Sequence, residues 1–530
     1  MNTESIPQIH RWRAFAVLAV AFFMTIVDLT IVNVALPTIG RDLHFSESNL
    51  QWVVTAYGIT FGGFLLLGGR AADLLGRRRI LMLGLGVFTA ASLGAGLSTS
   101  AGFLIAMRLL QGFGAAVVLP AALSIVMNMF AEGAERNKAL GLWGGIGAGG
   151  ATFGLIAGGL LTRYVGWESN FFLNVPIGAA AFLLAPRIVP ESRLQGVRRR
   201  FDPLGAVTVT GALLLVVYAI SKAPQAGWGS ARTVALLAAS LALLLAFVLI
   251  EMRVQAPLLP LRIFRLRTVA VANAAGFLLG GSFFAFIFIG TLYMQQVLGY
   301  SALQAGVAWL ATSLTSVALA GLSQLLVTRI SAGRVLVLGM ALIGGGILWA
   351  TQVPGQGHFW SALAGPFFVV GAGTAFAFVP ISIAGLAGVS APEAGLASGL
   401  LNTSQQLGGA IGVAIGSTVA ATHLKTLLGE GRPASVALTG GFHWAFWVCG
   451  TIALLALPVA ATLIGHRTVA AEILAPAPMD LGQSEDHKES EHSSASSQAR
   501  RSPGAPHHWD KTSSRAGRQR ARAARGRPRW

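Results

Sequence analysis

Long runs of apolar residues alternate with short polar segments along most of this chain. A run of about 17 to 25 apolar residues is long enough to cross a bilayer as a helix, and the chain contains fourteen such runs. They cover residues 14–36, 50–69, 80–98, 101–121, 139–161, 170–186, 204–221, 233–250, 269–292, 303–327, 335–352, 361–384, 398–421 and 443–464. The pattern therefore predicts an all-α, polytopic membrane protein with 14 transmembrane helices in the lipid bilayer.

Composition and charge support this class. Of the 530 residues, 54% are hydrophobic and 11% are charged, whereas soluble domains carry about 25% charged residues. The net charge of +18 would suggest nucleic acid as the partner of a soluble protein, but the arginines gather in alternate loops, as in Arg77, Arg78 and Arg79. This distribution follows the positive-inside rule. It predicts that both termini are cytoplasmic and that nucleic acid is not a partner.

Sequence features recur at an offset of about 258 residues. Gly76-Arg77 recurs as Gly333-Arg334, and Gly112-x-Gly114 recurs as Gly371-x-Gly373. The repeat predicts two pseudo-symmetric six-helix bundles, at residues 1–190 and 266–465. Two inserted helices with cytoplasmic loops are expected within 191–265, and a disordered basic cytoplasmic tail within 466–530. Duplicated halves that face a central cavity are suited to alternating access, because rocking of one half exposes a site to either side.

Asp28 is a carboxylate inside the first apolar run. A charge at bilayer depth costs at least about 2.5 to 3.5 kcal/mol, so such residues usually belong to an ion or substrate pathway. At about 1.5 Å per helical residue, Asp28 and Arg108 lie at the same depth, and we expect them to pair. The offset maps Asp28 onto Phe286 and Arg108 onto Phe367, so the pair would belong to the amino-terminal half alone.

The predicted pair suggests a proton-coupling role. A carboxylate beside a guanidinium holds a proton less tightly than a desolvated carboxylate without that partner. Motion that separates Asp28 from Arg108 would therefore change proton affinity, as an antiporter requires. The alternative is a static buried pair that only fixes helix packing.

The loop after the second run carries a candidate conformational gate formed by Gly69, Asp73, Gly76 and Arg77. Asp73 lies at the end of the run, where its carboxylate can cap the positive amino terminus of a neighbouring helix. Gly76 permits a tight turn. We expect Arg77 to face the headgroups and Asp73 to dock near the eleventh span when this side closes. The alternative is that the arginines only set the topology.

Polar and aromatic side chains within the runs suggest a substrate cavity, because large apolar pockets with few polar groups suit bulky ligands. The candidates are Asn33, Tyr57, Gln111, Asn273, Phe277, Phe284 and Phe288. Taken singly, each phenylalanine is better explained by packing or lipid contact than by substrate binding. A second set of small residues predicts close helix packing, namely Gly112, Gly114, Gly154, Gly158 and Gly159.

Several motifs together resemble the major facilitator superfamily, and within it the fourteen-helix drug:proton antiporters of bacteria. GGRAADLLGRRR from Gly68 is similar to the superfamily loop G-x-x-x-D-x-x-G-R-[KR]-[KR], and RLLQGFG from Arg108 is similar to R-x-x-Q-G-x-G. VDLTIVNVALP from Val27 and WESNFFLNVPIG from Trp167 resemble the first and sixth spans of that group. Where the family shows G-P-x-x-G-G, this chain has Leu155 in place of proline, which removes a kink from the fifth span.

The resemblance implies a secondary transporter in the bacterial plasma (inner) membrane that exports hydrophobic or amphipathic drugs in exchange for protons. Its partners would be a small-molecule substrate and protons, with no cofactor or metal, and it would act as a monomer. A proton-coupled symporter or facilitator of a metabolite is the alternative. An enzyme or a non-transporting scaffold is disfavoured, because the histidines are scattered and no acid–base cluster occurs at a span end.

Overall fold

The computed structural model describes residues 8–130, 134–192, 202–254, 257–259, 261–354, 358–389 and 394–464. The predicted tail at 466–530 lies outside the described residues. Within them, 14 helices are long and apolar enough to cross a membrane. Each matches one predicted run, so the prediction of a fourteen-span helical membrane protein is confirmed.

The first helices of the chain are continuous across their apolar runs, with short helical turns between some of them. Their bounds are α1 Gln8–Asp42, α2 Glu47–Leu50, α3 Trp52–Leu75, α4 Arg77–Gly96, α5 Ala101–Met129, α6 Ala134–Tyr164, α7 Ser169–Phe172 and α8 Asn174–Ile188. The helix α6 passes through Leu155 without interruption, as expected where proline is missing.

The remaining helices include two that contact each other closely before the second set of six begins. Their bounds are α9 Pro203–Ala226, α10 Ala231–Arg253, η1 Leu261–Arg265, α11 Arg267–Gln296, α12 Ala302–Ala308, α13 Leu310–Ile330, α14 Ala332–Trp349, η2 Ala350–Gln352, α15 Phe359–Ala362, α16 Ala364–Leu386, α17 Ala394–Gly429 and α18 Ala434–Ala461. The tenth predicted span is thus divided at Trp309 into α12 and α13.

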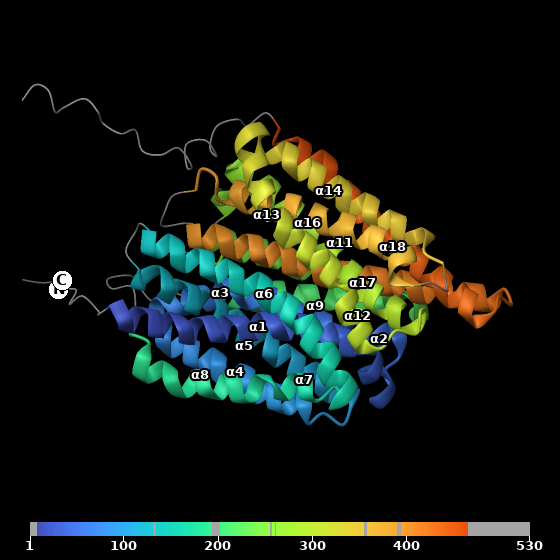
Figure 1. Cartoon of the computed structure of the whole chain (residues 1–530), viewed down its shortest axis with the longest axis horizontal. Helices are drawn as coiled ribbons and strands as arrows, with labels where there is room; N and C mark the ends of the chain where they lie inside the picture. Colours follow the sequence, from blue (N-terminus) through green and yellow to red (C-terminus); the bar gives the residue numbers. More distant parts are fainter. Residues whose placement is uncertain are drawn as a thin grey trace, which may run out of the picture. The chain divides into compact units, whose positions relative to one another are not determined.

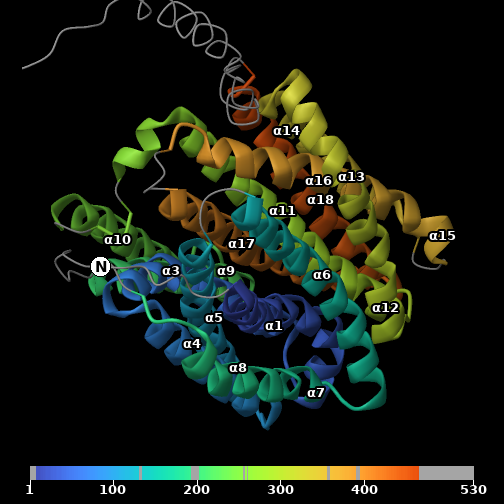
Figure 2. The same cartoon turned by 60° about the vertical axis from the view of Figure 1, so that its left-hand side comes forward.

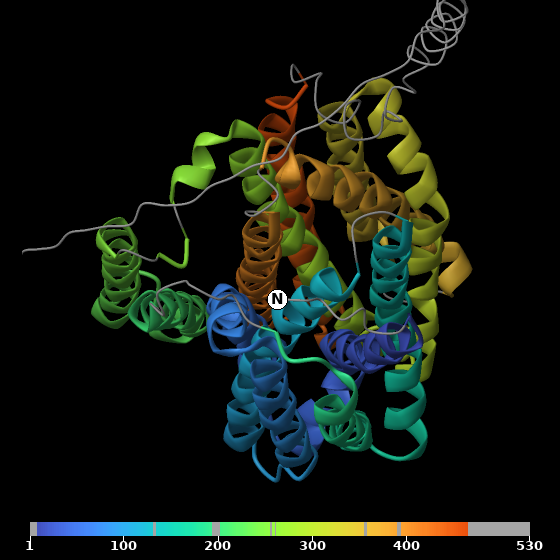
Figure 3. The same cartoon turned by 90° about the vertical axis from the view of Figure 1, so that its left-hand side faces the viewer.

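Helices far apart in sequence pack side by side (Figure 1). In the first set of helices, α1 to α8, α5 packs against α3 and α4, and α1 packs against α6. In the second set, α11 to α18, α16 packs against α13 and α14, and α11 packs against α17 and α18. The helix α10 packs against α9, which contacts both α3 and α17 (Figures 2 and 3). The inserted pair therefore touches both sets through α9.

Glycine pairs at equivalent places carry the closest packing in both sets. A Cβ at Gly112 would collide with the Tyr57 carbonyl on α3, and one at Gly114 would lie 2.8 Å from the Phe88 nitrogen on α4. In the second set, a Cβ at Gly371 would lie 2.6 Å from the Thr312 carbonyl of α13. This repeated contact supports the duplication inferred from the sequence, while the domain boundaries themselves stay a prediction.

The turn between the second and third spans of each set contains a residue with positive φ, and in the second set this residue is not the one that the sequence offset predicts. Gly76 has a φ of 116° between α3 and α4, and Ser331 has a φ of 130° between α13 and α14. Ser331, and not the expected Gly333, is therefore the structural counterpart of Gly76. The sequence offset was wrong here because Gly333 lies inside α14, where a Cβ would lie 2.6 Å from the Leu463 carbonyl carbon.

The contact of α6 with α1 gives a direct test of glycine packing. A Cβ at Gly158 would lie 2.7 Å from a Val34 methyl group and would collide with the Ile31 carbonyl, whereas Gly149 on the same helix faces open space. We expect Gly158→Val to destabilise the protein by about 1–3 kcal/mol through overpacking and Gly149→Val to leave it unchanged. Thermal unfolding of both purified variants measures this, and equal losses would contradict the packing role.

Candidate functional site

The buried carboxylate of Asp28 accepts hydrogen bonds from three side chains. Its Oδ2 accepts from Arg108 Nη1 at 2.7 Å, and its Oδ1 accepts from Gln111 Nε2 at 3.1 Å and from Asn174 Nδ2 at 2.7 Å. Asp28 is 0% exposed and Arg108 is 1% exposed. The predicted pairing of Asp28 with Arg108 is therefore present as a direct ion pair. Charge-assisted hydrogen bonds of this kind offset part of the desolvation of both ions.

Arg108 has further partners besides Asp28. Its Nε donates to the Val53 carbonyl at 2.7 Å, and its Nη1 also donates to Gln111 Oε1 at 3.0 Å. Its guanidinium carbon lies 4.5 Å from the centre of the Tyr57 ring, a cation–π contact. Tyr57 was expected to line a substrate cavity, but it is 1% exposed and belongs to the surroundings of Arg108.

The motif R-x-x-Q-G-x-G has a physical explanation in this geometry. Arg108 and Gln111 are three residues apart and therefore share one face of α5, which points at Asp28. Gly112 and Gly114 lie on adjacent faces and let α3 and α4 approach the helix. The glycines thus bring the neighbouring helices close enough to enclose the pair. Gln111, expected to bind substrate, is instead a partner of Asp28.

Two members of this network were missed by the sequence interpretation. Asn174 is the first residue of α8 and donates to Asp28, while Ser92 on α4 accepts from Gln111 Nε2 at 2.8 Å. Asn174 could have been recognised from the sequence, because it is a polar residue in an otherwise apolar run and belongs to the segment WESNFFLNVPIG that resembles the family's sixth span. Ser92 carried no signal, because a serine in a transmembrane helix usually bonds only to its own backbone.

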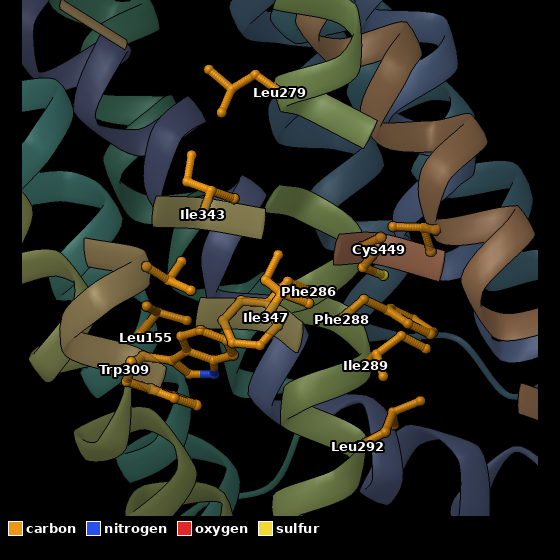
Figure 4. Close-up of a cluster of buried hydrophobic side chains, with 14 of the residues drawn as sticks. Leu155, Leu279, Phe286, Phe288, Ile289, Leu292, Trp309, Ile343, Ile347 and Cys449 are labelled. Atoms are coloured by element: carbon orange, nitrogen blue, oxygen red, sulfur yellow. The ribbon is translucent and has the colours of Figure 1, made fainter. Parts of the chain in front are cut away.

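The equivalent place in the second set of helices is aromatic. The rings of Phe286 and Phe367 lie 5.6 Å apart, and Trp309 lies 4.5 Å from Phe367. Trp309 also lies 5.3 Å from Phe286, and Figure 4 shows these two side chains within the buried apolar cluster. The sequence offset assigned Asp28 to Phe286 and Arg108 to Phe367, and the two phenylalanines do contact each other as the two charged residues do. Where the first set has a buried ion pair, the second has apolar rings packed edge to face or tilted against each other.

A small cavity lies between helices of both sets. Its lining comes from α1, α3, α11 and α17, and comprises Leu29, Thr30, Asn33, Val54, Thr55, Gly58, Phe284, Ile287, Gln406, Gly409, Ala410 and Val413. The free volume is about 40 Å³, whereas pockets for drug-sized ligands measure about 300–1,000 Å³. The cavity joins Asn33 and Phe284, two of the predicted substrate contacts.

The other predicted substrate residues do not line this cavity, and their part in substrate binding stays a prediction. Asn273 accepts from Ser404 Oγ at 2.8 Å, and Phe277 packs its backbone against Gly408. Phe288 is 0% exposed within the apolar core. Positions 277, 284 and 288 are seven and four residues apart and so share one side of α11, but they lie at different heights along the helix, and of the three only Phe284 lines this cavity.

The candidate gate residues form a compact turn at the end of α3. Asp73 Oδ1 accepts from Arg77 Nε at 3.0 Å and from Arg77 Nη2 at 2.7 Å. The Arg77 side chain is 7% exposed, so the expectation that it faces the headgroups was wrong. The pairing satisfies Asp73 within its own half in this conformation. Gly69 packs against Pro120 of α5, where a Cβ would lie at 3.4 Å.

Glu191, just after α8, also belongs to this turn and was not anticipated. Its Oε1 accepts from the backbone nitrogen of Arg78 at 3.1 Å, and its carboxylate lies within 4.0 Å of Arg78 and Arg79. A Cβ at Gly76 would lie 2.9 Å from Glu191 Oε1, so glycine is needed both for its positive φ and for this approach. The turn therefore ties α3 and α4 to the end of α8.

Several contacts between the two sets lie at the helix ends far from the start of α1. Gln295 Nε2 donates to the Val34 carbonyl at 2.9 Å, and Arg163 Nη1 donates to Ser301 Oγ at 3.4 Å. A Cβ at Gly159 would lie 2.7 Å from Leu303 Cα, which brings α6 against α12. The predicted packing role of Gly159 thus includes a contact between the sets.

These features define a class, a multi-pass membrane protein with a buried ion pair among its transmembrane helices. The sequence matches the Major Facilitator Superfamily over residues 18–413 and again over residues 273–509. The chain belongs to this superfamily, whose members are transporters, and the resemblance drawn from the motifs is confirmed.

Two bacterial relatives cover most of the chain. The cephamycin export protein CmcT of Amycolatopsis lactamdurans is 37% identical over 450 residues, which are 84% of this chain and 91% of that protein. The puromycin resistance protein pur8 of Streptomyces alboniger is 37% identical over 480 residues, which are 88% of this chain and 94% of that protein.

Solved structures share the fold at low identity. The crystal structure of the POT family transporter PepTSo has a TM-score of 0.63 and 15% identity, covering 85% of this chain and 97% of that one. A bacterial homologue of the human lysosomal transporter Spinster has a TM-score of 0.60 and 16% identity, covering 87% and 97%.

The ion pair predicts a specific pattern of stability. Arg108→Gln should destabilise the protein by about 3–5 kcal/mol, because it leaves Asp28 buried without its cation. The double variant with Asp28→Asn should recover part of this loss, since no charge is then left unpaired. Arg329→Gln, at an exposed arginine, is the control and should have little effect. Thermal unfolding of the four proteins measures this, and a double variant no more stable than Arg108→Gln would contradict the pairing.

Proposed function

We propose that this chain exports hydrophobic or amphipathic small molecules in exchange for protons. The observation that carries the proposal is the fully buried Asp28–Arg108 pair, because a membrane protein retains such a carboxylate chiefly for ion or substrate movement. The names of the relatives, a cephamycin exporter and a puromycin resistance protein, support export of antibiotic-like compounds.

Asp28 is suited to hold the transported proton. Its carboxylate accepts from Arg108, and movement of the helices that carry the two groups would leave it buried without a cation, where a carboxyl group favours its protonated form. Gln111 and Asn174 fit both states, because an amide presents either a donor or an acceptor after rotation of its last torsion. Asn174 Oδ1 has no hydrogen-bond partner within the described part of the chain, so it is available to accept from a protonated Asp28.

Alternating access follows from the two sets of helices. The contacts of α6 with α12 and of Gln295 with Val34 support a conformation closed at the end away from the start of α1. We assign that end to the outside, since the arginine-rich loops lie at the other end. Both termini would then be cytoplasmic, in a bacterial plasma membrane, and the molecule would work as a monomer. Asp73 and Arg77 would rearrange when the cytoplasmic end closes.

The cavity near Asn33 and Phe284 is the proposed start of the substrate site. Its lining is mostly apolar with a few amides and hydroxyls, which suits amphipathic ligands. At about 40 Å³ it holds no drug-sized molecule, so substrate binding requires that α1 and α3 move away from α11 and α17. The cavity lies between the sets, and rocking would widen it.

Cells that express the chain should accumulate less of a fluorescent amphipathic dye than control cells. The difference should disappear with a protonophore, because an inward proton gradient would drive the export. Dye levels that rise on expression would instead indicate uptake by a symporter or facilitator. A difference that survives the protonophore would contradict proton coupling.

Asp28→Asn should abolish dye-induced proton movement in inverted vesicles, with at least about a tenfold loss, because the amide keeps the shape but cannot release a proton. Asp42→Asn is the matched control, since Asp42 is an exposed carboxylate at the end of the same helix. Wild-type rates are expected for the control. Proton movement that persists in Asp28→Asn at normal protein levels would rule out Asp28 as the proton carrier.

A further inference from the structure

The open end of the α9–α10 hairpin holds two buried carboxyl groups outside the site described above. Asp202 precedes α9 and is 3% exposed, and Glu251 lies in the last turn of α10 and is 4% exposed. One oxygen of each group has a backbone partner. Asp202 Oδ1 accepts from the Gly205 nitrogen at 2.7 Å, and Glu251 Oε2 accepts from the Leu259 nitrogen at 3.0 Å.

The second oxygen of each group faces the other carboxyl group. Asp202 Oδ2 lies 2.5 Å and Glu251 Oε1 lies 2.9 Å from the point that a Cβ at Gly205 would occupy, so both oxygens meet above this glycine. Neither oxygen has a hydrogen-bond partner within the described residues. Two acceptor oxygens therefore lie beside the same glycine, and the described residues supply no donor to either.

Among the described residues, charged groups on the neighbouring elements do not partner either oxygen. Arg253 on α10 and Arg262 and Arg265 on η1 are exposed, and the ion pairs of the described residues include neither carboxyl group. The helices α3 and α17 meet α9 further along, at Thr210 and Ile220, through uncharged contacts. Among the described residues, the charged group that acts on Glu251 is Asp202.

We propose that Asp202 and Glu251 share one proton and form a second proton-binding site, separate from Asp28 and Arg108. Two carboxylates in contact in a low-dielectric place do not both ionise, and one proton between them supplies the missing donor. The proton enters from water and forms one O–H···O⁻ hydrogen bond. One negative charge remains, and it lies at the amino terminus of α9, where the helix dipole favours it.

The shared proton would join the start of α9 to the end of α10 at the open end of the hairpin. Asp202 stands where the chain begins α9, and Glu251 holds Leu259 on the segment that leads to η1 and α11. Gly205 is required because any side chain there would separate the two carboxyl groups. The site therefore couples the protonation of the hairpin end to the position of the segment before α11.

Infrared spectroscopy of the purified full-length protein tests the shared proton directly. A protonated carboxyl group has a C=O stretching band that a carboxylate lacks, and ordinary carboxyl groups are ionised above about pH 6. At pH 7 the wild type should keep a band that is reduced in both Glu251→Gln and Asp202→Asn. Glu430→Gln, at an exposed glutamate, should leave the band unchanged. Asp28 is present in every sample, so its contribution cancels in the differences.

Both variants are expected to fold, because asparagine caps a helix as well as aspartate and the glutamine amide can donate to Asp202. The thermal unfolding midpoint offers a second measurement. The wild-type midpoint should fall as the pH rises above about 5, because the unfolded chain has then released its carboxyl protons while the folded state still holds one, and it should level off once the folded state has released that proton. Glu251→Gln should flatten this fall. Wild-type and Glu251→Gln spectra with the same band at pH 7 would overturn the proposal, as would a stability that depends on sodium and not on pH.

Discussion

A carboxylate and a guanidinium buried at the same depth of a membrane protein stabilise each other only while they remain in contact. Asp28 and Arg108 meet this condition at 2.7 Å, and the surrounding helices are arranged to enclose them. The close approach of α3 and α4 to α5 at Gly112 and Gly114 brings Val53, Tyr57 and Ser92 around the pair. The interaction is strong because water is excluded, and for the same reason separation of the two groups would leave each charge buried without compensation.

The two sets of helices repeat a backbone plan but not its chemistry. Phe286, Phe367 and Trp309 fill the place that the ion pair takes in the first set, and they pack as rings with no charge to lose. An aromatic cluster tolerates small shifts of neighbouring helices, whereas an ion pair has a short range of favourable distances. A shift of helices within a set would therefore change the electrostatics of the first set but only the packing of the second.

Much of this organisation could be predicted from the sequence. Apolar runs predicted all fourteen helices, since the requirement for a bilayer span leaves a clear pattern. Equal depth predicted the contact of Asp28 with Arg108. The partners Asn174 and Ser92 could not be found in this way, because their roles depend on side-chain directions across helices. For the same reason the sequence could not distinguish Phe284, which lines the cavity, from Phe277 and Phe288. It also did not reveal that Arg77 is buried against Asp73. Asp202 and Glu251 lie about fifty residues apart in sequence, and only the folding of the hairpin brings them together.

The central claim is that Asp28 is the group whose proton competes with substrate. Equilibrium binding of a fluorescent substrate dye to the purified protein, measured across pH, tests it most directly. The wild-type affinity should rise about tenfold per pH unit over the range in which one proton is displaced, and the affinity of Asp28→Asn should be independent of pH. The same pH dependence in Asp28→Asn and wild type would contradict the account, because the displaced proton would then come from another group.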